Sequence, residues 1–166
     1  TNTIFENNYL GVYAAYSKLR ERDFANNKII GTSSAYDYRI LGSVAVPTKI
    51  YFLNCSYDDD AEYWGVYTSR EQLWYGTVNI SDSNGQVANS TVLVYDGENS
   101  LVANETTNSN GLTDPIPLRE YEGVYLAATT STKTYYGNHT FYATESEHFS
   151  GSAASNLSES KYISFS

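Results

Sequence analysis

The sequence predicts an all-β protein, in which a short parallel β-helix-like part is followed by an immunoglobulin-like β-sandwich. Three observations support this fold class. A Phe-x-Asn motif recurs in the first part of the chain, short alternating strands separated by turns fill the rest, and the composition favours strands. Only 17% of the 166 residues are charged, and 17 Tyr with no Met are typical of a β-rich surface protein.

The Phe-x-Asn motif begins at residues 5, 24 and 52, and a weaker signature alternates with it. The copies of that second signature are Gly11-Val12-Tyr13, a degenerate Tyr38-Arg39-Ile40, and Gly65-Val66-Tyr67. Repeats with two short β-like pieces and a loop of varying length are typical of a parallel β-helix. We therefore assign residues 1–72 to β-helix-like coils and residues 73–166 to the sandwich.

Successive coils are expected to hydrogen-bond as parallel strands, so that equivalent residues stack in columns. Stacked Phe would form the apolar interior, and stacked Asn would link the coils at a tight corner. The chain has about two and a half coils, fewer than such repeats generally need. We expect an uncovered edge near the chain start, where a longer precursor or a second chain supplies a further coil. The candidate residues of this assembly edge are Phe5, Asn7, Asn8, Phe24, Asn26 and Asn27.

The single cysteine, Cys55, excludes an internal disulfide. It occupies the repeat position of Asn8 and Asn27, which favours a small buried residue of the ladder over a catalytic thiol.

An acidic segment follows the last Phe-x-Asn motif. Four of its carboxylates could bind a calcium ion, which takes several oxygen ligands. The segment lacks the spaced alternation and the glycine of a calcium loop, so a solvated acidic loop is the favoured interpretation. No other cofactor is expected. The candidate ligands are Asp58, Asp59, Asp60 and Glu62.

After Trp74 the pattern changes to short strands with alternating apolar residues. Val78 and Ile80 alternate with polar residues in the first strand, and Val87, Ser90, Val92 and Val94 share one face of the next stretch. Turns are predicted at residues 82–85, 96–97 and 108–111. Further strands are predicted at residues 101–107, 124–130, 133–136, 139–144 and 160–165. Residues 115–121 contain two prolines, which predicts an edge strand or a connection.

This second part carries a resemblance to a known family. A strand from Thr77 is followed by Asp-x-Asn-Gly at residues 82–85, Val-x-x-Ser at 87–90, a second strand, and Thr-Asn-x-Asn-Gly at 107–111. With Ile-Pro-Leu-Arg-Glu-Tyr at 116–121, these motifs resemble a carboxypeptidase-regulatory-like domain. Ser90 and Asn108 replace the alanine and aspartate of that family's pattern.

The resemblance implies a transthyretin-like β-sandwich. The combination with upstream Phe-x-Asn coils resembles large surface proteins of methanogenic archaea, which place a right-handed parallel β-helix before such a sandwich. It implies an extracellular module, and it transfers no catalytic residue to this chain.

Six Asn-x-Ser/Thr sequons are present, a modest excess in a chain so rich in these residues. Asn54 is the least favoured acceptor, because its repeat position should point along the ladder. The candidate glycosylation sites are Asn79, Asn89, Asn104, Asn138 and Asn156.

No enzymatic constellation is recognisable. A polysaccharide lyase would need acids with a nearby base, and the candidates are Asp23, Asp37, Asp58, Asp59, Asp60, Glu62, Lys49 and Arg39. Surface acids on a solvated protein are the favoured interpretation. His139 and His148 lack partners at metal-ligand spacing, so each is expected to be an incidental surface histidine. We therefore predict that the protein is not an enzyme.

Tyrosines crowd the first part of the chain. Their rings could stack on sugars, which would indicate a carbohydrate-binding adhesin, or they could form interfaces. They are also simply good strand formers. These tyrosines are residues 9, 13, 16, 36, 38, 51, 57, 63 and 67.

The net charge of −9 argues against nucleic acid as a partner, and no apolar run is long enough to span a membrane. The start at Thr1 indicates a processed secreted chain or an excised fragment. The leading hypothesis is a structural subunit of an archaeal cell-surface filament, sheath or surface layer, with copies of itself as partners. A glycan-binding adhesin fragment is the alternative, and a polysaccharide lyase is less favoured.

Overall fold

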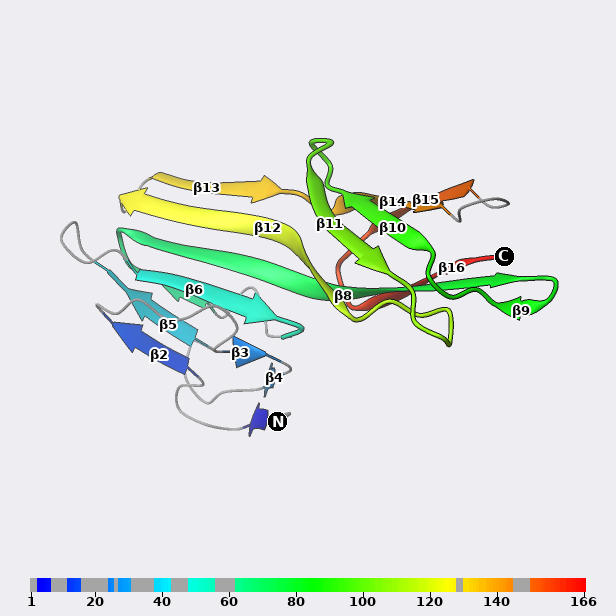
Figure 1. The fold of residues 1–166 in the computed structure, drawn as a ribbon. Helices are drawn as coiled ribbons and strands as arrows, with labels where there is room; N and C mark the ends of the chain where they lie inside the picture. Colours follow the sequence, from blue (N-terminus) through cyan, green and yellow to red (C-terminus); the bar gives the residue numbers. More distant parts are fainter. Residues whose placement is uncertain are drawn as a thin grey trace. The chain divides into compact units, whose positions relative to one another are not determined.

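The computed structural model describes residues 3–6, 12–15, 24–25, 27–30, 38–42, 48–55, 62–127, 130–144 and 150–166 (Figure 1). Within these ranges the regular elements are strands and no helix occurs, which confirms the all-β prediction. The strands of the first part are β1 (Thr3–Glu6), β2 (Val12–Ala15), β3 (Phe24–Ala25), β4 (Asn27–Ile30), β5 (Tyr38–Leu41), β6 (Thr48–Leu53) and β7 (Glu62–Trp64). The remaining strands are β8 (Thr68–Asp82), β9 (Gly85–Gln86), β10 (Thr91–Tyr95), β11 (Leu101–Thr106), β12 (Ile116–Ala127), β13 (Thr130–Tyr135), β14 (Asn138–Thr144), β15 (Ser150–Asn156) and β16 (Lys161–Phe165).

The chain divides into two compact units. Unit 1 comprises Thr1–Leu73 and Tyr121–Thr134, and unit 2 comprises Trp74–Glu120 and Tyr135–Ser166. The first change of unit falls beside the boundary at residues 72 and 73 that the sequence suggests. The return of 121–134 to unit 1 has no counterpart in the sequence analysis. As a result, strands β8 and β12 each contribute residues to both units.

Unit 1 contains three ladders of parallel strands: β1 pairs with β4 in the first, β5 pairs with both β2 and β7 in the second, and β6 pairs with both β3 and β8 in the third. The strands therefore recur in the same order from one repeat to the next. Parallel pairing between repeats was the main structural expectation from the motif, and it is confirmed. Phe24 lies opposite Phe52, as the aligned motifs require.

Two details of the predicted alignment are wrong. Phe5 pairs with Ile29 of β4 rather than with Phe24, because the second repeat aligns with β1 through the strand that follows its motif. In the second ladder Val12 lies opposite Tyr38, one position away from the alignment of the signatures. Its third strand is Glu62–Trp64, and Val66 and Tyr67 instead form the following turn, with Tyr67 at a φ of 57°.

The hairpin of β12 and β13 extends the sheet that ends the third ladder. The strand order of this sheet is β13-β12-β8-β6-β3, so β12 covers the edge of β8 that faces away from β6 (Figure 1). The prediction of an edge strand or connection at 115–121 is therefore wrong for the part of β12 that lies between β8 and β13, whereas it agrees with the position of Pro117. Pro117 is tolerated because it is the second residue of β12. The backbone N–H of Tyr136, just past β13, donates to the carbonyl of Glu120, so Pro117 precedes the part of β12 that lies beside β13.

The interior of unit 1 combines apolar and polar side chains. Ile50, Phe52 and Leu53 of β6 are fully buried. Opposite Ile50 and Phe52 on β8 lie Arg70 and Gln72, which are also buried. The guanidinium carbon of Arg70 lies 4.7 Å from the ring centroid of Tyr121, a cation–π contact with β12. Phe24, Phe52 and Gln72 occupy the same position on three successive strands, so the column that begins with two phenylalanines ends in a polar residue.

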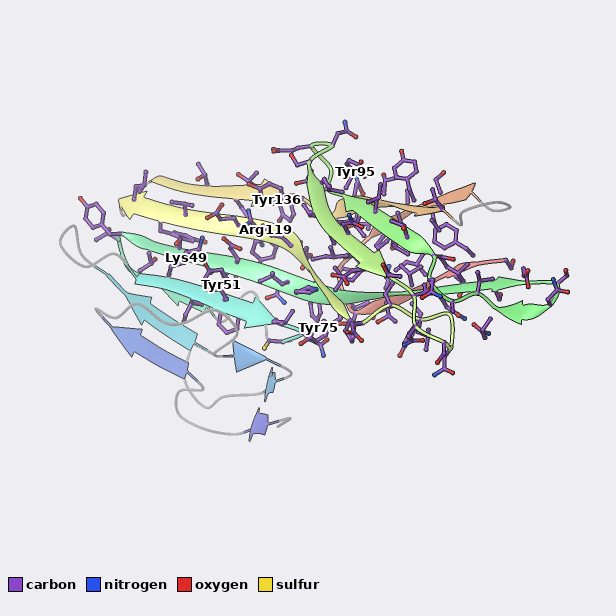
Figure 2. The ribbon with its side chains drawn as sticks, viewed as in Figure 1. Lys49, Tyr51, Tyr75, Tyr95, Arg119 and Tyr136 are labelled. Carbon is purple, nitrogen blue, oxygen red and sulfur yellow. The ribbon has the colours of Figure 1, made fainter. Side chains whose placement is uncertain are left out.

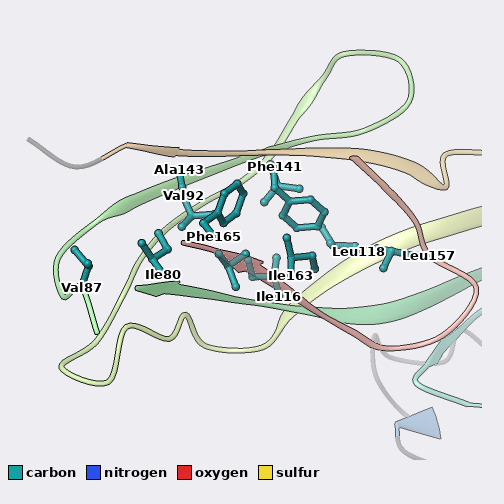
Figure 3. Packing of buried hydrophobic residues seen from close by; sticks show 12 residues of the cluster. Ile80, Val87, Val92, Ile116, Leu118, Phe141, Ala143, Leu157, Ile163 and Phe165 are labelled. Atoms are coloured by element: carbon teal, nitrogen blue, oxygen red, sulfur yellow. The ribbon is translucent and has the colours of Figure 1, made fainter. Parts of the chain in front are cut away.

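Unit 2 has a four-stranded antiparallel sheet of order β11-β10-β14-β15. Its inward side chains, including Val92, Val94, Phe141 and Ala143, pack against apolar residues of β8, β12 and β16 (Figure 3). Val87, Ser90, Val92 and Val94 are all buried, as predicted from their alternation. The other members of this core are Val78, Ile80, Val87, Ile116, Leu118, Leu157, Ile163 and Phe165.

The predicted turns of unit 2 are confirmed. Asp82 and Gly85 close the first turn, and the Asp82 side chain accepts a hydrogen bond from the Asn84 N–H. Asp96 Oδ1 accepts from the N–H groups of Glu98 and Ser100 in the second turn. In the third turn Asn108 Oδ1 accepts from the N–H of Asn110. Strand β15 is absent from the predicted set, because its sequence of Ser, Gly, Ala and Asn lacks the apolar alternation of the other strands.

Candidate interaction surface

The outward face of the four-stranded sheet is the most distinctive exposed surface in the described residues. Residues directly opposite one another in antiparallel strands point to the same face. Leu93 lies between Asn104 and Tyr142, and Tyr95 pairs with Thr140. We call this set the outer face. Its members are Thr91, Leu93, Tyr95, Asn104, Thr106, Asn138, Thr140, Tyr142, Thr144, Ser152, Ala154 and Asn156.

The outer face carries no charged side chain, although the chain has a net charge of −9. Tyr142 is 44% exposed, and its ring meets that of Tyr95 edge-to-face, with 5.6 Å between centroids and 88° between planes. This pair fixes the orientation of both rings. Figure 2 labels Tyr95 on β10.

A groove of about 430 Å³ lies over this tyrosine pair. Leu93, Tyr95, Asn99, Thr140, Tyr142 and Thr144 line it. The lining combines aromatic and aliphatic surface with hydroxyl and amide groups, a composition suited to a neutral polar ligand.

The two edges of this sheet differ in how they are protected. β11 contains Glu105, and a bulge interrupts its pairing with β10 at Val94 and Tyr95. β15 has the sequence Ser-Gly-Ser-Ala-Ala-Ser-Asn and pairs with β14 in unbroken register over all of its residues. It has no charge, no proline and no bulge, which are the usual means of blocking an edge strand.

The structure separates the candidate glycosylation sites into two groups. Asn89, Asn104, Asn138 and Asn156 are exposed, and the last three belong to the outer face. Asn138 and Asn156 lie directly opposite each other. Asn79 is half-buried on β8, with its side-chain oxygen shielded from solvent. Asn54 is half-buried at a φ of 52°, at the corner that follows β6.

The candidate assembly edge is described in part. Phe5, Phe24 and Asn27 lie in β1, β3 and β4, whereas Asn7, Asn8 and Asn26 lie outside the described residues. Within the described part of unit 1, β2 and β3 each end their sheet with one edge unpaired.

One of the four candidate calcium ligands lies in the described part of the chain. Asp58, Asp59 and Asp60 fall outside it, and Glu62 lies in β7. No group of three or more His, Cys, Asp or Glu residues that could hold a metal ion occurs among the residues whose placement is given.

Of the candidate lyase residues, Asp23 and Asp37 lie outside the described ranges. Arg39 pairs through its backbone with Tyr13 and Tyr63. Lys49 Nζ lies 2.5 Å from the Glu71 carboxylate and 3.5 Å from that of Glu122, and it also approaches the ring of Tyr51 (Figure 2). Burial acts to lower the pKa of Lys49, but the hydrogen bond and charge of Glu71, with Tyr51, outweigh it and raise the pKa. Lys49 is therefore the charged ion-pair partner of Glu71 and Glu122.

The prediction of a surface histidine at residue 139 is wrong. His139 is 1% exposed, and its Nδ1 lies 3.4 Å from the carbonyl oxygen of Gly137. Its strand position points inward, opposite Ser155. Burial lowers its pKa, although the Gly137 carbonyl and the charge of Asp96 act in the opposite direction. His148 lies outside the described residues.

Cys55 is buried, as predicted, and its Sγ donates to the carbonyl oxygen of Leu53 at 3.4 Å. Among the tyrosines of the first part, Tyr51 and Tyr67 are half-buried, and Tyr13, Tyr38 and Tyr63 lie in β2, β5 and β7. Tyr9, Tyr16, Tyr36 and Tyr57 lie outside the described ranges. The sequence analysis missed Tyr95 and Tyr142 as a pair. The two rings meet through the pairing of β10 with β14, and no local sequence signal indicates that pairing.

No helix in the described part is long and apolar enough to cross a membrane. No protein-family model, curated protein or solved structure matches the chain.

Proposed function

We propose that this chain is a structural subunit of an extracellular cell-surface assembly of the archaeal type, such as a filament, sheath or surface layer. In this proposal unit 1 is a short parallel β-helix, and unit 2 is an immunoglobulin-like or transthyretin-like sandwich. Copies of the chain would associate through the edges of their sheets, and no enzymatic activity is involved.

One observation carries the proposal: among the residues that the structure describes, the second and third ladders of unit 1 end at β2 and β3 with one edge of each strand unpaired. Each ladder already joins equivalent strands of successive repeats, so a further parallel strand can add with the same hydrogen-bond pattern. Contacts of this head-to-tail kind that do not close produce fibres or tubes. The low charge content and the uncharged outer face are in keeping with a protein that packs against neighbours.

Negative-stain microscopy and light scattering of the purified chain test the proposal. We expect filaments, tubes or sheets as the concentration rises. A chain that stays monomeric and well folded at high concentration would overturn it.

A matched pair of variants tests the edge itself. Ala25→Lys places a charge on β3 and is expected to reduce assembly, because a lysine on an edge strand opposes further pairing. Ser164→Lys makes the same change at an exposed position of β16 in unit 2, outside the ladders of unit 1, and should leave this contact intact. Equal assembly of both variants would argue against the β3 edge.

The groove beside Tyr95 and Tyr142 favours a second candidate, binding of a neutral glycan. Aromatic rings stack on sugar rings, while Thr140, Thr144 and Asn99 offer hydroxyl and amide groups for hydrogen bonds. Titration with neutral oligosaccharides, followed by NMR, tests this candidate. Tyr142→Ala should weaken binding at least tenfold, whereas Tyr162→Ala should not, because Tyr162 lies on β16, outside the groove. Equal affinity in both variants would exclude the groove.

A further inference from the structure

Strand β15 is an edge strand whose sequence carries no charge and no proline to block further pairing. It ends the four-stranded sheet, and β14 is its partner strand among the described residues. Its seven residues are small and uncharged, and each has a partner on β14. A regular strand of this kind presents a row of N–H and C=O groups to whatever strand approaches.

The direction of these N–H and C=O groups follows from one backbone hydrogen bond. The N–H of Leu157 donates to the carbonyl of Gly137 at 3.0 Å, in the same register that pairs β15 with β14. In antiparallel ladders hydrogen-bonded and non-hydrogen-bonded pairs alternate. Odd-numbered residues of β15, including Ala153, therefore bond to β14. Even-numbered residues, including Ser152 and Ala154, direct their N–H and C=O groups to the open edge.

We propose that β15 pairs antiparallel with β15 of a second copy of this chain, about a two-fold axis at Ala153. In this register Ser152 lies opposite Ala154 of the second copy, and Ser150 lies opposite Asn156. All four of these positions direct their backbone groups outward, so about eight hydrogen bonds form across the contact. Ala153 meets its own counterpart as a non-hydrogen-bonded pair, consistent with its use of N–H and C=O toward β14.

The second copy is favoured as the occupant because the strand is complementary to itself. Reversing its sequence places small residues opposite small residues at every position, and no like charges meet. A chain with a net charge of −9 repels its copies over most of its surface, so an uncharged strand is where they approach at least cost. The paired sheets form one continuous eight-stranded sheet, and the two outer faces become a single uncharged surface.

This inference rests on the proposed function, since it names a second contact of the same assembly. The unit 1 edge would join chains head to tail, whereas β15 joins them as symmetric pairs. The two contacts use different strands, so they can be tested separately.

Cysteine cross-linking tests the register. Ala153→Cys places two thiols opposite each other across the axis, close enough for a disulfide, whereas Ser155→Cys on the same face lies opposite Gly151 of the second copy. Under mild oxidation of unglycosylated chain we expect at least fivefold more dimer from Ala153→Cys. The wild-type chain, oxidised in the same way, is the control for any dimer that forms through Cys55, which is buried. Equal yields, or none from Ala153→Cys, would overturn the register.

Sedimentation of a matched pair of proline variants tests the edge. Ala154→Pro removes an outward N–H from β15 and should raise the dissociation constant of the pair at least tenfold. Asn104→Pro removes the equivalent group from β11, because Thr107 N–H bonds to Ser90 and the alternation directs Asn104 outward. Association of that variant should match the wild type.

Each outcome has a distinct meaning. If Ala154→Pro does not fold, as judged by circular dichroism, Ala154→Lys replaces it, and the same tenfold effect is expected. If assembly is unchanged by Ala154→Pro, or by Ala154→Lys where that variant replaces it, the β15 contact is overturned and the proposed function stands. A wild-type chain that stays monomeric at every concentration overturns both.

Discussion

At the scale of single residues, His139 links the fold to pH. The side chain is buried in the neutral form on the inward side of β14, and this burial lowers its pKa below the ordinary value of 6.5. An unfolded chain takes up a proton near that ordinary value, whereas the folded chain resists protonation until a lower pH. The free energy of unfolding is therefore undiminished above pH 6.5 and falls as the pH drops from 6.5 toward the folded-state pKa.

We expect this pH dependence to be reduced in His139→Gln, which removes the titrating group. Chemical denaturation between pH 8 and 5 measures it. The wild type should lose stability below pH 6.5 with a slope of up to about 1.4 kcal/mol per pH unit from this group, and the variant should lack that component. The difference between the two proteins at pH 8, where the histidine is neutral in both states, gives the cost unrelated to titration. If the free energy of unfolding has the same pH dependence in the wild type and in His139→Gln, His139 does not titrate in this way.

Buried polar and charged residues explain why sequence patterns locate apolar cores better than polar interiors. The alternation of Val78, Ile80, Val92 and Val94 predicted their burial correctly. Arg70 and Glu71 are equally buried, but their partners Tyr121 and Lys49 lie on strands distant in sequence, so no local pattern indicates their burial. The same reason hid the Tyr95–Tyr142 pair, which depends on the pairing of β10 with β14.

At the scale of elements, the turn from Asn108 to Gly111 is the most constrained connection in unit 2. Gly111 has a φ of 70°, and its N–H donates to the carbonyl of Asn108. A methyl group there would collide with the backbone oxygen of Ile80 and lie 2.6 Å from Gln86 Oε1. Glycine therefore satisfies both the backbone conformation and the close approach of β8.

Gly111→Ala is expected to lower the free energy of unfolding by more than about 2 kcal/mol, because strain and overpacking act together. Gly97→Ala is the control. Its added methyl group would meet atoms no closer than 3.7 Å, so the expected loss is under about 1 kcal/mol. Thermal denaturation of the two variants measures the difference, and similar losses would contradict the geometry.

Elements with turn chemistry or apolar alternation were predicted well, and those defined by tertiary pairing were not. Asp-x-Asn-Gly and Asn-x-Asn-Gly specify their turns through side-chain hydrogen bonds that are local in sequence. The length of β8 and the central position of β12 depend on distant strands. β15 consists of residues with weak strand preference, and its pairing with β14 is what makes it a strand.

At the scale of the whole molecule, the two units share their strands. β8 changes unit at residues 73 and 74, and β12 changes at 120 and 121, with no loop at either point. The sequence indicated two successive parts because the repeat stops where the alternating strands begin. It gave no sign that a later segment returns to the first part, since the β12–β13 hairpin carries no Phe-x-Asn motif.

Shared strands predict that the units unfold together. The chain has two tryptophans, Trp64 in unit 1 and Trp74 in unit 2. Trp64→Phe and Trp74→Phe each leave one fluorescent reporter, and we expect the same normalised unfolding curve from both, coincident with circular dichroism. Introducing Gly111→Ala into each should shift both reporters equally. Transitions that separate would show that the continuous strands do not couple the units.

The β12–β13 hairpin, which lies beside β8 in the same sheet, has a consequence for how the number of repeats can vary. The hairpin ends the third ladder at β8, so the number of repeats that precede β8 is not fixed by the rest of the fold. Insertion or loss of a whole repeat before β6 would leave the β8–β12 junction and unit 2 unchanged. The number of repeats in unit 1 is therefore adjustable, and chains of the same design with more repeats would carry the same second unit.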